Sequence, residues 1–217
     1  MKVERFATGI LSTNCYLAIC EETKKTVVID PAACPSYLME HMKTERLQVE
    51  AILLTHGHFD HTMGIEGFLR EYPVPVYACE AEKEVLSAPQ KNLSLTYTKG
   101  YSFEGATFLR DGQELELAGC IFRMIHTPGH TPGGCCYYVE SEQILFSGDT
   151  LFQNSIGRAD FPESDPQALL DAIREKLFVL PDEVLVYPGH MGETTIGHEK
   201  RNNPYCKLRD VHDIDHL

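Results

Sequence analysis

Short apolar runs separated by polar turns predict a chain rich in β-strands. Residues 14–20 and 26–30 form two such runs with a polar turn between them, which is typical of a β-hairpin. Residues 51–54 form a third run, which ends at a glycine-containing loop and therefore indicates a buried strand. Further strands are predicted at residues 73–78, 106–109, 114–117, 120–126, 135–139, 143–147 and 183–187.

Helices are predicted between these strands. The clearest spans residues 165–180, because Asp165 is a good N-cap, Pro166 suits the first helical position, and leucine and isoleucine then recur at helical spacing. Shorter helices are predicted at residues 36–47, 64–71 and 80–87. Residues 88–104 are irregular and are interpreted either as a flap near a site or as a surface loop. Two strand-rich halves with interspersed helices favour an α/β fold in which two sheets pack face to face with helices outside.

The length and cysteine pattern suggest a cytoplasmic protein of one domain. We expect residues 1–217 to form one domain, with a short C-terminal tail from about residue 203 and a flexible end at residues 209–217. No apolar run is long enough to span a membrane, and the charged first residues lack the features of a secretory signal. The 8 cysteines contain no Cys-x-x-Cys pair, which argues against a sulfur metal site and a disulfide framework and favours the reducing cytoplasm.

The charge balance narrows the class of partner. The formal net charge is −13, from 19 Lys and Arg against 32 Asp and Glu, and such an acidic surface disfavours nucleic-acid backbones and anionic lipids. We therefore expect a small-molecule substrate, and neither a nucleic acid nor a membrane, as the partner. The oligomeric state stays open at this point.

The segment from Thr55 to His61, which reads Thr-His-Gly-His-Phe-Asp-His, carries the strongest chemical signal. Three imidazoles and one carboxylate fall within six residues, directly after the predicted strand 51–54. Neutral imidazole and carboxylate are ligands that suit zinc, iron or manganese. One histidine here would be an ordinary loop residue, but four ligand-type side chains at this spacing predict a metal site.

Three later loops repeat the same arrangement, in which an apolar strand runs into a glycine-containing turn that presents one ligand-type residue. If the strands share a direction, these loops meet the first motif at one edge of the sandwich. Seven ligand-type groups exceed what one tetrahedral ion needs, which favours two metals. The candidate ligands are His56, His58, Asp60, His61, His130, Asp149 and His190.

These motifs resemble those of the metallo-β-lactamase superfamily, and in particular its short, single-domain bacterial glyoxalase II-like hydrolases. The similarity comprises Thr-His-Gly-His-Phe-Asp-His at 55–61, Thr-Pro-Gly-His-Thr-Pro-Gly at 127–133, Ser-Gly-Asp-Thr-Leu-Phe at 147–152 and Tyr-Pro-Gly-His at 187–190. It extends from about residue 14 to 204. The resemblance implies a four-layer αβ/βα sandwich of two mixed β-sheets with outer helices. It also implies two divalent metal ions, zinc foremost, with iron or manganese as alternatives.

The resemblance assigns a role to each candidate ligand. It places His56, His58 and His130 on the first ion, Asp60, His61 and His190 on the second, and Asp149 as the bridge between them. Asp60 is also the expected catalytic residue, since it would orient the nucleophilic water. His58 stands where the diiron oxygen-reducing relatives carry a glutamate, which argues against that branch.

The implied activity is hydrolysis of a thioester or similar activated acyl substrate by metal-bound hydroxide, as in hydroxyacylglutathione hydrolase. Arg158 matches a basic position that this family uses near glutathione, so it is the candidate substrate-binding residue. Asp160 and Gly192, however, stand where tyrosines are common, and only a short segment follows His190 where glyoxalase II has a helical domain. Arg158 therefore either binds a substrate carboxylate or pairs with Asp160 or Glu163.

Other functions share this fold and these motifs. Persulfide dioxygenases use one iron, bound by residues that match His56, His58 and His130 or a related subset including Asp149, and they carry a segment similar to residues 157–161. A lactonase, a phosphodiesterase and a non-catalytic metal binder also stay open. The acidic charge disfavours a nuclease.

Overall fold

The computed structural model describes residues 1–207 and places most of the strands in two six-stranded sheets. In the first sheet β1 to β3 pair antiparallel and β3 to β6 pair parallel. The predicted hairpin is confirmed as β2 and β3, whereas β1 is not among the predicted strands. The strands follow chain order: β1 (Lys2–Thr8), β2 (Thr13–Ile19), β3 (Lys25–Ile29), β4 (Gln48–Leu53), β5 (Val76–Cys79) and β6 (Ala106–Leu109).

The second sheet has three strands that run in one direction. Its order is β14 (Thr194–Thr195), β13 (Leu185–Pro188), β10 (Ile144–Gly148), β9 (Cys135–Val139), β8 (Cys120–His126) and β7 (Glu114–Leu117). Neighbours β7 to β10 pair antiparallel and β13 pairs parallel to β10, so β8, β10 and β13 share a direction. A separate small hairpin joins β11 (Leu151–Phe152) to β12 (Ser155–Ile156).

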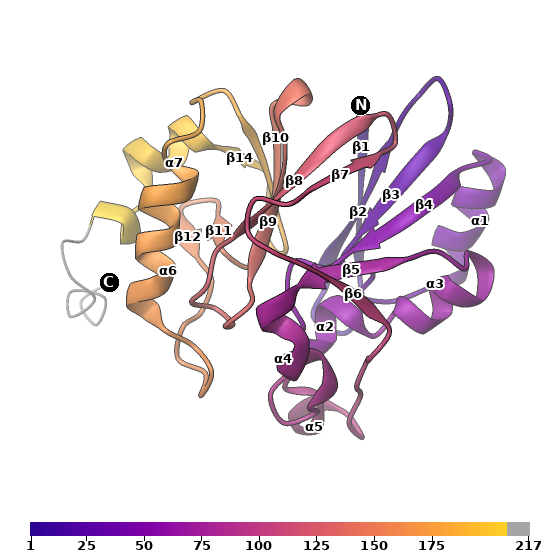
Figure 1. The fold of residues 1–217 in the computed structure, drawn as a ribbon, viewed down its shortest axis with the longest axis horizontal. Helices are drawn as coiled ribbons and strands as arrows, with labels where there is room; N and C mark the ends of the chain where they lie inside the picture. Colours follow the sequence, from indigo (N-terminus) through magenta and orange to yellow (C-terminus); the bar gives the residue numbers. More distant parts are fainter. Residues whose placement is uncertain (208–217) are drawn as a thin grey trace.

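Helices cover the outer faces of both sheets (Figure 1). The outer face of the first sheet packs against α1 (Ser36–Thr44) and α3 (Ile65–Glu71). The second packs against α6 (Pro166–Ala172), its π-helical continuation η3 (Ile173–Leu177), and α7 (Ile196–Asn202). The remaining helices are short: α2 (Phe59–Thr62), η1 (Glu80–Glu82), α4 (Lys83–Ser87), α5 (Ser94–Tyr97), η2 (Glu140–Glu142) and η4 (Tyr205–Lys207).

Three clusters of buried apolar side chains lie between the four layers of helices and sheets. Within β2, Leu17 packs toward α1 while the adjacent Tyr16 packs between the sheets, where it meets Phe146 of β10. Leu145, next along β10, packs instead against Leu169 of α6. Because both faces of these strands are buried, they appear in the sequence as continuous apolar runs. The expected four-layer αβ/βα sandwich is therefore confirmed.

Element ends differ from the predictions at several places. The carboxylate of Asp165 caps α6 as predicted, accepting hydrogen bonds from the backbone N–H groups of Gln167 and Ala168 at 3.0 Å each. The helix predicted for residues 165–180 ends at Leu177, and the one predicted for residues 36–47 ends at Thr44. The predicted flexible end, residues 209–217, lies outside the described residues. Within residues 1–207, no helix is both long and apolar enough to cross a bilayer.

Candidate metal centre

The loops that carry the predicted ligands meet around the carboxylate of Asp149. The loops after β8, β10 and β13 leave the same edge of the second sheet because those strands share a direction. Asp149 Oδ1 lies 3.3 Å from Nε2 of His61, which belongs to the short helix α2 after β4. Asp149 Oδ2 lies 3.6 Å from Nε2 of both His130 and His190. The structure therefore brings the loops of both sheets together at one point.

Six side chains form two groups of three around this point, and Asp149 is the seventh ligand-type residue. In each group the ligand-type atoms lie within 4.8 Å of one another. A third set overlaps both groups and includes Asp149. These clusters are consistent with a dinuclear metal site. The first group is His56, His58 and His130, the second is Asp60, His61 and His190, and the set that joins them is His56, His61 and Asp149.

Three buried polar atoms at this point lack a hydrogen-bond partner: His56 Nε2, His61 Nε2 and Asp149 Oδ1. A buried polar atom without a partner costs about 1–3 kcal/mol, and more when the group is charged. Bound metal ions would satisfy these atoms, because each of them is a potential metal ligand. The donor set therefore fits a metal ion.

The hydrogen bonds that His61 and His130 make through Nδ1 also indicate a metal site. His61 Nδ1 donates to Asp30 Oδ2 at 2.8 Å, and His130 Nδ1 donates to the carbonyl oxygen of Arg158 at 2.7 Å. These bonds place a proton on Nδ1 and direct the Nε2 lone pair into the site, which is the arrangement that metal-binding histidines use. The His130 Nε2 atom then lies 2.9 Å from His58 Nδ1, so both nitrogens face one position.

Burial and neighbouring charges set the protonation of the groups. Burial, reinforced by nearby histidines, lowers the pKa of His56 well below its usual value and that of His58 to about 3. Burial also lowers the pKa of His130. These three imidazoles are therefore neutral at pH 7, as metal ligation requires. Although burial opposes it, His61 and His190 lower the pKa of Asp60, so that carboxylate stays ionised.

The pKa of His61 is shifted in the opposite direction, upward. Burial alone would lower its pKa, but the carboxylates of Asp149, Asp60 and Asp30 together raise the pKa well above its usual value. The site therefore favours a positive charge close to His61 Nε2. A divalent cation at that position would supply the charge in place of the proton.

Asp30 is a functional residue that the sequence patterns did not identify. It follows β3 with a left-handed φ of 50°, a conformation that aspartate tolerates better than most residues. Its Oδ1 accepts from the backbone N–H of Thr55 at 2.8 Å, and its Oδ2 accepts from Thr55 Oγ1 at 2.6 Å and from His61. The available signal was a carboxylate at the end of a buried strand, directly before Pro31.

The second group is anchored by the N-terminal strand β2. Asn14 donates from its backbone N–H to the Gly189 carbonyl at 2.8 Å, and Tyr16 donates its hydroxyl to the Pro188 carbonyl at 2.7 Å. Thr13 Oγ1 donates to Asp60 Oδ2 at 2.8 Å. One strand thus positions both the segment that leads into His190 and the carboxylate opposite it.

A pocket of about 320 Å³ opens onto the two groups, and its wall is largely apolar. The segment 88–104 contributes Leu93 and Tyr97 to this wall, which supports its interpretation as a flap near the site. The Tyr97 ring stacks on that of Phe59 with centroids 5.1 Å apart. The other apolar lining residues are Leu11, Phe152, Ile156, Phe161 and Met191.

Arg158 lines the same pocket but is already paired. Its Nε and Nη2 donate to the two carboxylate oxygens of Asp160 at 2.9 and 2.7 Å, and its Cζ lies 4.6 Å from the centroid of the Phe161 ring. The structure thus shows an ion pair with Asp160, one of the two partners that the sequence offered within the chain. The backbone of Arg158 nevertheless contributes to the site, because its carbonyl fixes His130.

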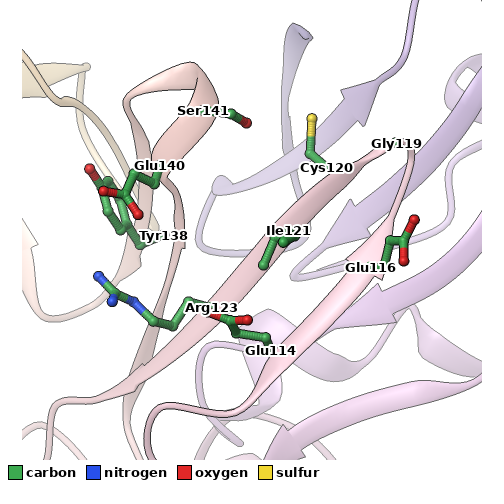
Figure 2. A pocket seen from close by; sticks show the side chains of 9 residues that line it. All are labelled: Glu114, Glu116, Gly119, Cys120, Ile121, Arg123, Tyr138, Glu140 and Ser141. Atoms are coloured by element: carbon green, nitrogen blue, oxygen red, sulfur yellow. The ribbon is translucent and has the colours of Figure 1, made fainter.

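A larger cavity lies elsewhere, on the outer face of the second sheet (Figure 2). It measures about 650 Å³ and is formed by β7, β8, β9 and the turn after them. The guanidinium carbon of Arg123 lies 5.4 Å from the centroid of the Tyr138 ring, and none of the seven clustered side chains lines this cavity. The larger of these two cavities is therefore not the one beside the ligand-type side chains.

Comparison with known proteins agrees with this geometry. Residues 8–190 match the family model described as the metallo-beta-lactamase superfamily. Hydroxyacylglutathione hydrolase GloC of Haemophilus influenzae is 33% identical over 212 residues, which cover 96% of this chain and 100% of GloC. The BLEG-1 B3 metallo-beta-lactamase structure is 36% identical, with a TM-score of 0.90, and the match covers 95% of this chain and 100% of BLEG-1. TTHA1623 in a di-iron-bound form is 34% identical, with a TM-score of 0.81, and that match covers 93% and 99% of the two chains.

Proposed function

The chain belongs to the metallo-beta-lactamase superfamily, and on that premise we propose that it is a binuclear hydrolase of thioesters or similarly activated acyl substrates. The observation that carries the proposal is the position of Asp149 between two complete groups of ligand-type side chains. The three partnerless atoms occur at the same place. A second group made of Asp60, His61 and His190 supports a site for two ions over a site for one.

The residues around the proposed ions orient the attacking water and shield the pocket from solvent. Bound divalent ions lower the pKa of a water molecule toward neutrality and polarise a carbonyl. Asp60 is ionised and held by Thr13, so we assign it the orientation of the attacking water. The apolar wall around the pocket excludes other water and strengthens the electrostatic interactions inside it. A thiolate leaves with little help from an acid, because a thiol, with a pKa of about 8.5, is far more acidic than an alcohol.

The pocket lining supports an acyl substrate with an apolar portion. Most of the wall is aliphatic or aromatic, and the cationic side chain in it, Arg158, is neutralised by Asp160. The relative GloC is named as a hydroxyacylglutathione hydrolase, which supports thioester chemistry. We assign zinc to both groups, with iron or manganese as the alternatives. All 8 cysteines are free thiols, which supports a place in the reducing cytoplasm.

The proposal is tested by metal analysis together with two assays. We expect protein purified without added metal to contain two equivalents of zinc or manganese and to hydrolyse acyl thioesters, including S-lactoylglutathione and thioesters with apolar acyl groups. The contrasting assay follows oxygen uptake with glutathione persulfide. One equivalent of iron with oxygen uptake and no thioester hydrolysis would replace this proposal with a persulfide dioxygenase.

Substitution of Arg158 by alanine is expected to have a small effect. Because its charge is already matched by Asp160 at an exposed site, kcat/KM for an apolar acyl thioester should stay within about fivefold of the wild type. The matched variant is Asp160→Ala, which frees the guanidinium and should favour substrates that carry a carboxylate. A selective loss of kcat/KM for S-lactoylglutathione in Arg158→Ala would show instead that the arginine binds that substrate.

A further inference from the structure

A buried glutamate connects the two loops that carry the first group. Glu82, at the end of η1, is 0% exposed. Its Oε1 accepts from the backbone N–H of Gly57 at 2.8 Å, and its Oε2 accepts from Thr131 Oγ1 at 3.1 Å. The backbone N–H of Gly133 is a further donor to this carboxylate. Gly57 lies between His56 and His58, whereas Thr131 follows His130.

Both glycines make this contact sterically feasible. A Cβ atom on Gly133 would lie 2.3 Å from the backbone nitrogen of Glu82 and 2.5 Å from its Oε2. A Cβ atom on Gly57 would lie 3.2 Å from Glu82 Oε1 and 3.0 Å from a methyl carbon of Val85. The backbones of the two loops therefore approach the carboxylate as closely as they do only because neither position carries a side chain.

We propose that Glu82 is a positioning residue that sets the separation of the two loops and thereby the geometry of His56, His58 and His130. The carboxylate holds one loop on each oxygen, at a place where His58 Nδ1 and His130 Nε2 lie 2.9 Å apart. It contacts neither the second group nor Asp149. Removal of its second acceptor oxygen would let the loops separate, because an amide group would then face the Gly133 N–H donor to donor.

This inference rests on the proposed metal site, and it predicts a defect confined to one ion. The probe is Zn²⁺ titrated into metal-free protein in competition with a chromophoric chelator. In a His190→Ala background, which retains the first group, Glu82→Gln should lower Zn²⁺ affinity about 10–100-fold. In a His58→Ala background, which retains the second group, the same change should leave the affinity within about threefold, since Glu82 does not contact that group.

Glu199 provides a matched control. It is also a 0% exposed glutamate, and its Oε2 accepts from the backbone N–H of Asn154 at 2.9 Å and from Asn203 Nδ2 at 2.8 Å. Glu199→Gln therefore perturbs a buried carboxylate without touching the loops of the first group. It should leave Zn²⁺ affinity unchanged in both backgrounds. Equal losses for Glu82→Gln and Glu199→Gln, or equal losses at both groups, would overturn the inference.

Thr131→Val keeps the test decisive if Glu82→Gln does not fold. This change removes one hydrogen bond to Glu82 with little change in shape, so it should weaken the first-group affinity about three- to tenfold. Wild-type affinity in Thr131→Val would overturn the role of Glu82. A wild-type chain that binds no ion would overturn the proposed function as well. Two bound ions together with an unaffected Glu82→Gln variant would overturn this inference alone.

Discussion

Replacing Asp60 by alanine is expected to lower kcat at least about 10³-fold and to reduce the bound metal from two ions to one. The change removes a carboxylate whose Oδ2 lies 3.3 Å from His190 Nε2 and accepts a hydrogen bond from Thr13. The second group then loses its anionic member, and the attacking water loses the group that orients it. Steady-state kinetics and elemental analysis of the same sample measure both effects.

Asp182→Ala is a suitable control for this experiment. Asp182 is an aspartate whose side chain is 52% exposed and which pairs with Lys200 and Arg201 and with none of the clustered side chains among the described residues. Its replacement should leave kcat and metal content unchanged. If Asp60→Ala kept full turnover with two ions bound, the assignment of Asp60 as ligand and catalytic residue would be wrong.

Removal of both ions with a chelator is expected to abolish turnover and to lower the melting temperature substantially. A ligand present at 1,000 times its Kd stabilises the folded state by about 4 kcal/mol. For a chain of this size that corresponds to roughly 8–16 °C for each ion, at about 2–4 °C per kcal/mol. The expected destabilisation has a structural origin, because His56 Nε2, His61 Nε2 and Asp149 Oδ1 are buried and lack a hydrogen-bond partner.

Differential scanning calorimetry of metal-free and reloaded protein measures this effect. Turnover and the melting temperature should return together when zinc or manganese is added back, whereas magnesium, which prefers oxygen ligands, should restore neither. Identical melting temperatures with and without metal would contradict binding at the buried groups. Turnover that persists after complete metal removal would contradict the proposed chemistry.

The central strands and the ligand clusters were predictable from the sequence for a physical reason. β2, β10 and the second half of β4 are buried on both faces, so they contain continuous apolar runs that stand out from the polar turns. The ligand-type residues follow directly after such strands. The convergence of the loops after β8, β10 and β13 follows from the direction that these three strands share.

The elements that the sequence did not predict contain no continuous apolar run. β1 is an edge strand whose residues are mostly half-buried or exposed, and its charged side chains conceal the pattern. β14 has two residues, which is too short for any periodicity to be detected. The 3-10 turn that carries Glu82 was predicted only as part of a helix, because nothing in its local sequence distinguishes a buried glutamate from a solvated one.

The supporting residues of the site could not be predicted, because most of them act through contacts between residues far apart in the sequence. Asp30 supports His61 across a separation of 31 residues, and Glu82 supports Thr131 across 49. Pairing of Arg158 with Asp160 is local, but sequence alone did not separate it from a bond to a substrate carboxylate. Such partners are decided by packing of the two sheets, which no local pattern encodes.

The hydrogen bond from Tyr16 to the Pro188 carbonyl joins residues 172 positions apart, and it has a consequence for biosynthesis. A nascent chain emerges from the ribosome N-terminus first, so β2 is available long before the segment it will hold. His56, His58 and His130 are all translated while His190 is still missing from Asp60 and His61. The group of Asp60, His61 and His190 therefore becomes complete only after His190 has been translated, whereas the group of His56, His58 and His130 is available about 60 residues earlier.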